Sequence, residues 1–93
     1  MFIFCLEIHL SLPARTLKEK RGLVKSILGR SRHRFNSACA EVDRQDNPAV
    51  AVLGFVTVSP DKTSARSVLE RIEEWIYESW PEVEISGSDI SEV

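Results

Sequence analysis

Several residue types that mark common functional sites are scarce in this chain of 93 residues. It has two cysteines, one methionine, four prolines and four glycines, and aromatic residues make up only 8%. The two cysteines, Cys5 and Cys39, are too few and too far apart for a disulfide framework or a zinc site. The glycines are scattered along the chain, so the sequence contains no glycine-rich loop that could bind phosphate. We therefore expect no bound metal, no cofactor and no small-molecule substrate.

A long hydrophobic run is also lacking. The apolar segment 1–10, MFIFCLEIHL, has neither the basic leader nor the small-residue cleavage site of a signal peptide. It is far too short to span a bilayer. We expect a protein that does not enter the membrane and that works in the reduced environment of the cytoplasm.

The residues that are present describe an ordinary globular domain. Hydrophobic residues make up 43% of the chain and charged residues 28%, which are typical values. A chain of this length has room for one hydrophobic core, so we expect residues 1–93 to form a single domain.

The charges are unevenly distributed, although the net charge is only −2. From Arg15 to Arg34 there are eight basic residues against the single acid Glu19, a net of +7. From Glu70 to Val93 there are eight acids against the single base Arg71, a net of −7. Such asymmetry indicates a basic face that can attract an anionic partner.

Hydrophobic periodicity predicts a strand and a helix in the first third of the chain. Apolar residues alternate at period two from Phe2 to Leu10, which is typical of a strand. The sequence TLKE at residues 16–19 is a capping box, in which Thr16 and Glu19 satisfy each other's free amides at the start of a helix. Leu17, Val24 and Ile27 belong to the apolar stripe of that helix.

The remainder predicts two strands, a second helix and a last strand. Residues 34–43, RFNSACAEVD, read as an edge strand, and the apolar run 49–58, AVAVLGFVTV, reads as a central one in which Gly54 marks a bulge or a close contact. The second helix is expected to begin at Ser59-Pro60-Asp61, with Ser59 as its N-cap, and to end at Pro81. Residues 83–90, VEISGSDI, predict a short edge strand.

The resulting order, β-α-β-β-α-β, predicts an α+β fold of the ferredoxin-like type. Right-handed crossovers place both helices on one face of a four-stranded antiparallel sheet with the strand order 4-1-3-2. The other face of the sheet is left uncovered by the chain.

Three stretches of the sequence resemble the YlxP-like family of small bacterial proteins of unknown function. They are SLPARTLKEKRGLVKSIL, RFNSACAEVDRQD and AVLGFVTVS. The resemblance implies a ferredoxin-like fold and, because genes of the family commonly stand beside genes for translation initiation and ribosome maturation, a role linked to translation. It supplies no catalytic residue. The chain departs from the family at Gly22, where a larger residue is expected, and at Asn47-Pro48, where an aromatic residue often follows the acidic turn.

The basic segment supplies the first candidate site, a surface for RNA or the ribosome. Basic side chains that recur along one flank of a helix can each meet a phosphate, giving affinity without base readout. The candidate contacts are Lys18, Lys20, Arg21, Lys25, Arg32 and Arg34. The alternative interpretation is a solvated helix face, balanced by the acidic second helix beside it. Both interpretations stay open.

The uncovered sheet face supplies a second candidate site and an alternative function. Depending on the register of the central strand, Leu53 and Phe55 or the alternate residues of that strand lie on it. Stacking of RNA bases there is disfavoured because Phe55 is the only aromatic on offer and no RNP motif is present. An exposed apolar sheet face more often marks a protein interface. The alternative function is therefore a homodimer formed through Leu53 and Phe55.

Two catalytic interpretations are weaker. An acid–base or metal cluster of Glu7, His9, Glu41 and Asp43 is opposed by the strand order, because the central strand separates the two strands that carry them. The segment SLPART offers Arg15 but no glycine, unlike the phosphate loop of acylphosphatases, which share this topology. We therefore expect a binding protein rather than an enzyme.

Overall fold

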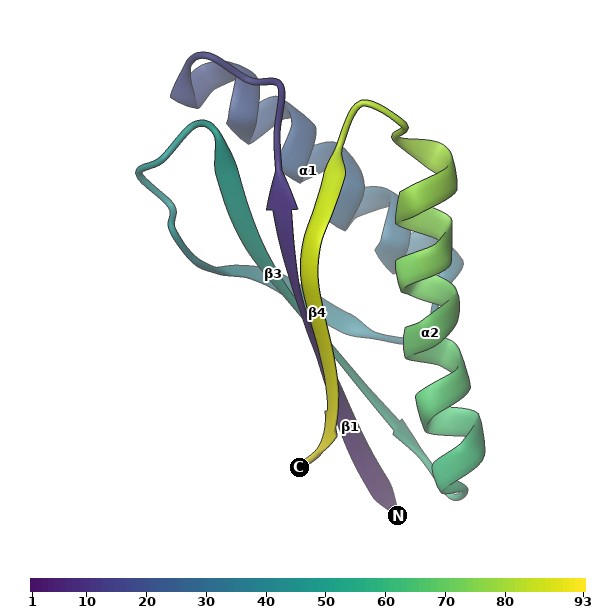
Figure 1. Ribbon diagram of the computed structural model, residues 1–93. Helices are drawn as coiled ribbons and strands as arrows, with labels where there is room; N and C mark the ends of the chain where they lie inside the picture. Colours follow the sequence, from purple (N-terminus) through teal and green to yellow (C-terminus); the bar gives the residue numbers. More distant parts are fainter.

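The predicted elements all occur, in the predicted order, in a computed structural model that describes residues 1–93. They are β1 (Phe2–Ser11), α1 (Leu17–Arg34), β2 (Ala38–Asp43), β3 (Val50–Ser59), α2 (Lys62–Ser79) and β4 (Glu84–Glu92). The strands form one antiparallel sheet in the order β2-β3-β1-β4, and both helices cover the same face (Figure 1). The predicted ferredoxin-like fold is confirmed.

Helix α1 begins at the predicted capping box. The Thr16 Oγ1 atom accepts a hydrogen bond from the Glu19 amide at 3.1 Å, and the Glu19 carboxylate accepts one from the Thr16 amide at 3.1 Å. The helix ends at Arg34, where Phe35 turns into the core and its amide caps the Ser31 carbonyl. Strand β2 therefore starts at Ala38, later than the sequence pattern indicated.

The N-cap of helix α2 lies two residues after the predicted one. The cap is Asp61 rather than Ser59, because β3 remains paired with β1 as far as the partners Ser59 and Phe2. The Asp61 carboxylate accepts hydrogen bonds from the Ser64 hydroxyl at 2.8 Å and from the Ser64 amide at 3.0 Å. These bonds favour the charged form and lower the pKa of Asp61 from its ordinary value of 3.8.

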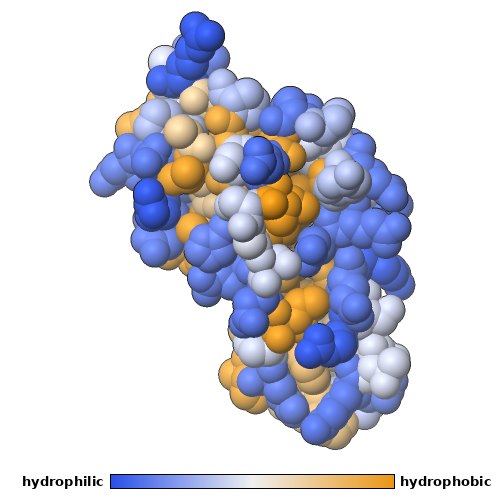
Figure 2. All heavy atoms as spheres, in the orientation of Figure 1, coloured by the Kyte–Doolittle hydropathy of each residue, from blue (hydrophilic) through white to orange (hydrophobic).

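The core lies between the helices and the two central strands. Leu6 faces Phe55 and Ile8 faces Leu53 across the β1–β3 pair, and all four side chains are buried. Since neighbours on paired strands share a face, this register aims Leu53 and Phe55 at the helices. Apolar side chains on the molecular surface occur as several separate patches among hydrophilic ones on the side shown in Figure 2.

The two helices lie towards opposite edges of the sheet. Helix α1 packs against the edge strand β2, whereas α2 packs against β3, β1 and the other edge strand, β4. Neither helix is long and apolar enough to cross a membrane.

Candidate nucleic-acid interface

The outer flank of α1 presents three cations that are free of partners. Lys18, Arg21 and Lys25 are exposed, and none of them takes part in an ion pair. Their spacing of three, four and seven residues keeps them on one side of the helix, because residues three or four apart are neighbours on a helix surface. This flank, defined by Lys18, Arg21, Lys25 and Arg32, is called the basic flank below.

Arg32 shows where the basic flank lies relative to the sheet. Its guanidinium donates a hydrogen bond of 2.9 Å to the Cys39 carbonyl on the edge strand β2. The basic flank therefore follows the outer edge of the sheet. Arg32 is exposed, and its remaining N–H groups can still meet an anion.

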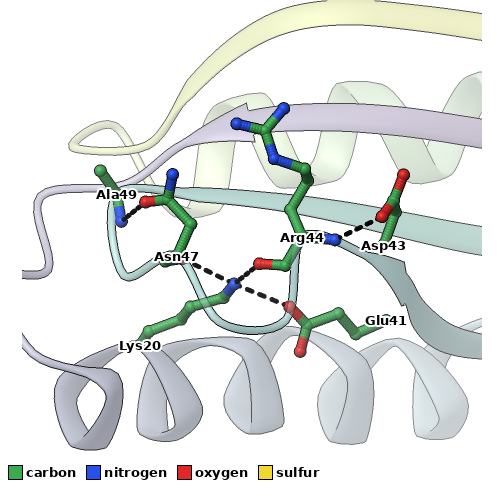
Figure 3. Close-up of polar contacts among 6 residues, drawn as sticks. All are labelled: Lys20, Glu41, Asp43, Arg44, Asn47 and Ala49. Carbon is green, nitrogen blue, oxygen red and sulfur yellow. Dashed lines mark hydrogen bonds and ion pairs between the residues drawn. The ribbon is translucent and has the colours of Figure 1, made fainter.

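Lys20 does not belong to this surface, and its prediction as a phosphate contact was wrong. The side chain is 1% exposed and points from α1 to the turn between β2 and β3 (Figure 3). Its Nζ atom donates to the Arg44 carbonyl at 2.6 Å and to the Asn47 carbonyl at 2.8 Å, and it lies 2.9 Å from the Glu41 carboxylate. A buried lysine is tolerated where its charge is paired and its donors are satisfied.

The Lys20 contacts bring together two segments that are far apart in the sequence. They join the segment TLKEKR to the segment AEVDRQD, which lie in two of the stretches that resemble the family. Arg44 has a φ of 61°, a left-handed conformation that is unusual for a residue with a side chain. Because Lys20 binds the carbonyl of this residue, it stabilises the unusual turn. The segment TLKEKR thus supplies a structural contact, through Lys20, as well as surface charge.

Arg34 is exposed but lies away from the basic flank. Its guanidinium is 5.7 Å from the centre of the Phe35 ring, and it lines a hollow together with Arg71 and Trp75 of α2. Arg30, on the same side of α1, stacks 4.9 Å from the centre of the Trp80 ring. These arginines lie on the side of α1 that faces α2.

The opposite charges of the two helices are not paired directly. The ion pairs of the molecule join Lys20 to Glu41 and Lys62 to Glu92, and neither of them links α1 to α2. The acidic helix therefore does not neutralise the basic flank by contact. The positive charge of the flank remains available to a partner in solution.

Leu53 and Phe55 are not on the uncovered face, and their prediction as interface residues was wrong. Both are 0% exposed and lie under the helices. The alternate residues of β3 face outward instead, among them Val56 at 41% and Val58 at 48% exposure, beside Val42 of β2 at 51%. The sequence could not distinguish the two sets because both faces of β3 are apolar.

The weak catalytic cluster also divides between two faces. Glu7 and His9 are neighbours on the uncovered face, with 3.1 Å between the carboxylate and Nε2. Glu41 points to the helix side, where it pairs with Lys20. No group of three or more His, Cys, Asp or Glu side chains gathers in a way that could hold a metal ion.

Comparison with known families shows which family the chain belongs to. Residues 3–90 match the family described as a protein of unknown function, DUF503. The chain belongs to this family. It is 35% identical over 71 residues to the uncharacterized protein YlxP of Bacillus subtilis (strain 168), an alignment that covers 76% of each chain.

Two solved structures with a similar backbone are designed proteins. The de novo designed protein Foldit4 superposes with a TM-score of 0.55 at 20% identity, covering 98% of this chain and 96% of the designed one. A de novo designed protein with a ferredoxin fold, solved by NMR, superposes with a TM-score of 0.56 at 17% identity, covering 100% and 84%. At these identities the likeness shows the fold alone.

Proposed function

We propose that this protein is a non-enzymatic, cytoplasmic binding protein that holds RNA, on or near the ribosome, through the basic flank of α1. The observation that carries the proposal is the set of exposed cations without carboxylate partners on one side of one helix. The translation-linked role that the family resemblance implies points to RNA among the possible anionic partners.

The arrangement suits a phosphate backbone better than a base. The charged ends of three side chains, Lys18, Arg21 and Lys25, are spread along successive turns of the helix. Arg32 adds a planar guanidinium group at the edge of the sheet. No aromatic side chain stands among them to stack a base. We therefore expect affinity that is largely independent of RNA sequence and that comes from the release of counterions.

The backbone of α1 is also accessible on this side. Gly22 and Gly29 lie on the outer side of the helix, and a methyl group added at either position would meet nothing within 4 Å. A strand of RNA can therefore lie close to the helix between the cations. The glycines support the proposal only through this access, since the cations supply the binding energy.

The test is a salt titration of RNA binding followed by fluorescence anisotropy, with labelled fragments of ribosomal RNA. Three or four phosphate contacts predict that the logarithm of the affinity falls with the logarithm of the salt concentration with a slope of about −2 to −4. The variant Lys18→Glu/Arg21→Glu/Lys25→Glu is expected to lose this binding while keeping the wild-type circular dichroism spectrum.

A matched control separates the flank from total charge. The variant Lys62→Glu/Arg66→Glu/Arg71→Glu makes the same change in net charge on exposed positions of α2, and it should retain most of the affinity. Equal losses in both variants would assign binding to overall charge rather than to the basic flank. Undiminished binding by the α1 variant, or no binding by the wild type at low salt, would refute the proposal.

A further inference from the structure

The uncovered face of the sheet has an apolar strip along the strands β2 and β3 and the first residues of β1. Its side chains are small or branched, carry no charge, and line two shallow hollows that share Ala38 and Val56. The apolar strip consists of Ile3, Ala38, Ala40, Val42, Val56 and Val58. Gly54 lies within it, and a methyl group there would come within 3.0 Å of Val42. The Val42 side chain therefore lies over Gly54, and the strip contains no aromatic or charged side chain.

The other half of the same face is acidic. Glu7 of β1 and Asp89 of β4 are direct partners across the two strands and lie on the uncovered face. His9 makes the only close contact to the Glu7 carboxylate. Two like charges directly opposite each other destabilise a sheet, so a cation brought close to this acidic strip would be favourable.

Three kinds of surface thus follow one another across the molecule. The basic edge, where Arg32 reaches the outer strand β2, adjoins the apolar strip, and the apolar strip adjoins the acidic strip on β1 and β4. When a second copy is rotated by half a turn about an axis parallel to the strands, the two apolar strips face each other. The basic edge of each copy then faces the acidic strip of the other.

We infer that the apolar strip binds a second copy of this chain in a twofold, offset, face-to-face dimer. The two apolar strips cover each other at the spacing of stacked sheets, about 10 Å. The offset leaves the acidic strip of each copy, with Glu7 and Asp89, over the basic edge of the other copy, with Arg32. The contact is isologous, so each pairing occurs twice and the assembly closes at two chains.

Two other arrangements of the same copies are disfavoured by charge. Full overlap of the sheets about an axis across the strands would place Glu7 and Asp89 over the same strands of the partner, and about an axis parallel to the strands it would place them over the partner's apolar strip. Pairing of the two β2 edges would bring both copies of Arg32 together and would remove each from the Cys39 carbonyl that it binds. An edge that carries such a charge resists strand pairing.

The size of the apolar strip predicts a weak dimer. Six residues of β2 at about 3.3 Å each, over about three strand spacings, give on the order of 300 Å² per copy. Stable interfaces bury about 800 Å² per partner. We therefore expect dimerisation in the micromolar range or weaker, and a loss of affinity at high salt because the flanking charges contribute. This dimer does not depend on RNA binding.

The test is sedimentation velocity of the whole chain from low micromolar to millimolar concentration, at low and at high salt. The wild type is expected to change from monomer to dimer over this range. Val56→Glu should remain monomeric, because it places a charge at the centre of the apolar strip. Tyr77→Glu is the matched control, since it makes the same charge change at an exposed residue of α2, 70% exposed, and should still dimerise.

Charge exchange tests the orientation of the copies. Asp89→Lys and Arg32→Glu should each weaken the dimer by about two- to tenfold, as expected for two symmetry-related surface pairs, and the double variant should recover most of the loss. If Val56→Glu does not fold, Val56→Thr removes the apolar contact while keeping a residue that favours strands.

Three results would overturn the inference. A wild type that is monomeric at all concentrations, or a dimer that survives both substitutions of Val56, removes the apolar strip as the interface. Failure of the double charge exchange to recover the affinity removes the offset orientation.

Discussion

Helices α1 and α2 have the same length, 18 residues, and cover the same sheet face, but they are attached to it differently. The residues that α2 buries are all apolar: Ala65, Leu69, Ile72 and Ile76. Helix α1 buries Lys20 and Ser31 alongside its apolar residues. The buried side of the helix that carries the proposed site is therefore held partly by hydrogen bonds and an ion pair, whereas the buried side of α2 is held by apolar packing, and its ion pair from Lys62 to Glu92 lies at the surface.

This difference has a physical consequence. Hydrophobic burial contributes in proportion to area and tolerates small shifts of a helix, whereas the Lys20 contacts require particular distances to three oxygen atoms. The Lys20 contacts thus fix the position of helix α1 relative to the β2–β3 turn. The outer side of the helix carries the cations and two glycines. Each prediction below perturbs one of these attachments.

The largest effect is expected for Lys20→Ala. It leaves the Glu41 carboxylate, 20% exposed, without its cation, and leaves the carbonyls of Arg44 and Asn47 without a donor. Removing one partner of a buried pair typically costs about 3–5 kcal/mol, and the partial exposure of Glu41 places this case near the lower limit. Urea unfolding followed by tryptophan fluorescence measures the loss.

Lys18→Ala is the control for that substitution. It removes a lysine from the same helix at an exposed position without an ion pair, so the free energy of unfolding should change by less than about 0.5 kcal/mol. Comparable losses in the two variants would show that α1 depends on its total charge rather than on the Lys20 contacts.

A smaller effect, of opposite sign, is expected at the glycines of α1. Gly22→Ala and Gly29→Ala should each raise the free energy of unfolding by about 1 kcal/mol, because alanine favours a helix and the added methyl group meets no neighbour. Gly54→Ala in β3 should lower it, because its methyl group would lie 3.0 Å from Val42 Cγ1. Thermal unfolding of the three variants gives the comparison, and a destabilised Gly22→Ala would contradict it.

The smallest effect concerns the start of α2. The hydrogen bonds from Ser64 lower the pKa of Asp61 below its ordinary value of 3.8, so the unfolded chain binds a proton more readily than the folded one. The stability that the Asp61 carboxylate contributes is complete above that value and is lost as the pH falls through the lowered pKa. Asp61→Asn keeps a capping oxygen and should show a shallower loss of stability in acid. An unchanged acid dependence would rule out this contribution.

Much of the fold could be predicted because local patterns and topology agree. The period-two alternation of β1, the capping box at Thr16 and the helix end before Pro81 all lie where the sequence places them. The exception at Ser59 arose because serine is a good cap in isolation, while the pairing of β3 with β1 kept that residue in the strand. Tertiary pairing overrode a local preference.

The candidate site was predictable in part. Lys18, Arg21 and Lys25 are where helical spacing places them, exposed on one flank. The position of Lys20 also carried a signal, because it lies four residues before Val24 and seven before Ile27 and therefore shares their buried side. A charged side chain is expected at the surface. The burial of Lys20 is explained only by its partners Glu41, Arg44 and Asn47.

The sequence by itself determined the order of elements and the strand order, which follow from periodicity, capping and connection rules, and it determined the separation of charge along the chain. Only the tertiary structure decided which face of β3 is buried, because that strand is apolar on both sides and its pairing with Leu6 and Ile8 selects the face. It also decided that the basic flank lies along one edge of the sheet and the acidic strip beyond the other side of the apolar strip. Those placements depend on contacts between residues far apart in the chain, which no local pattern records.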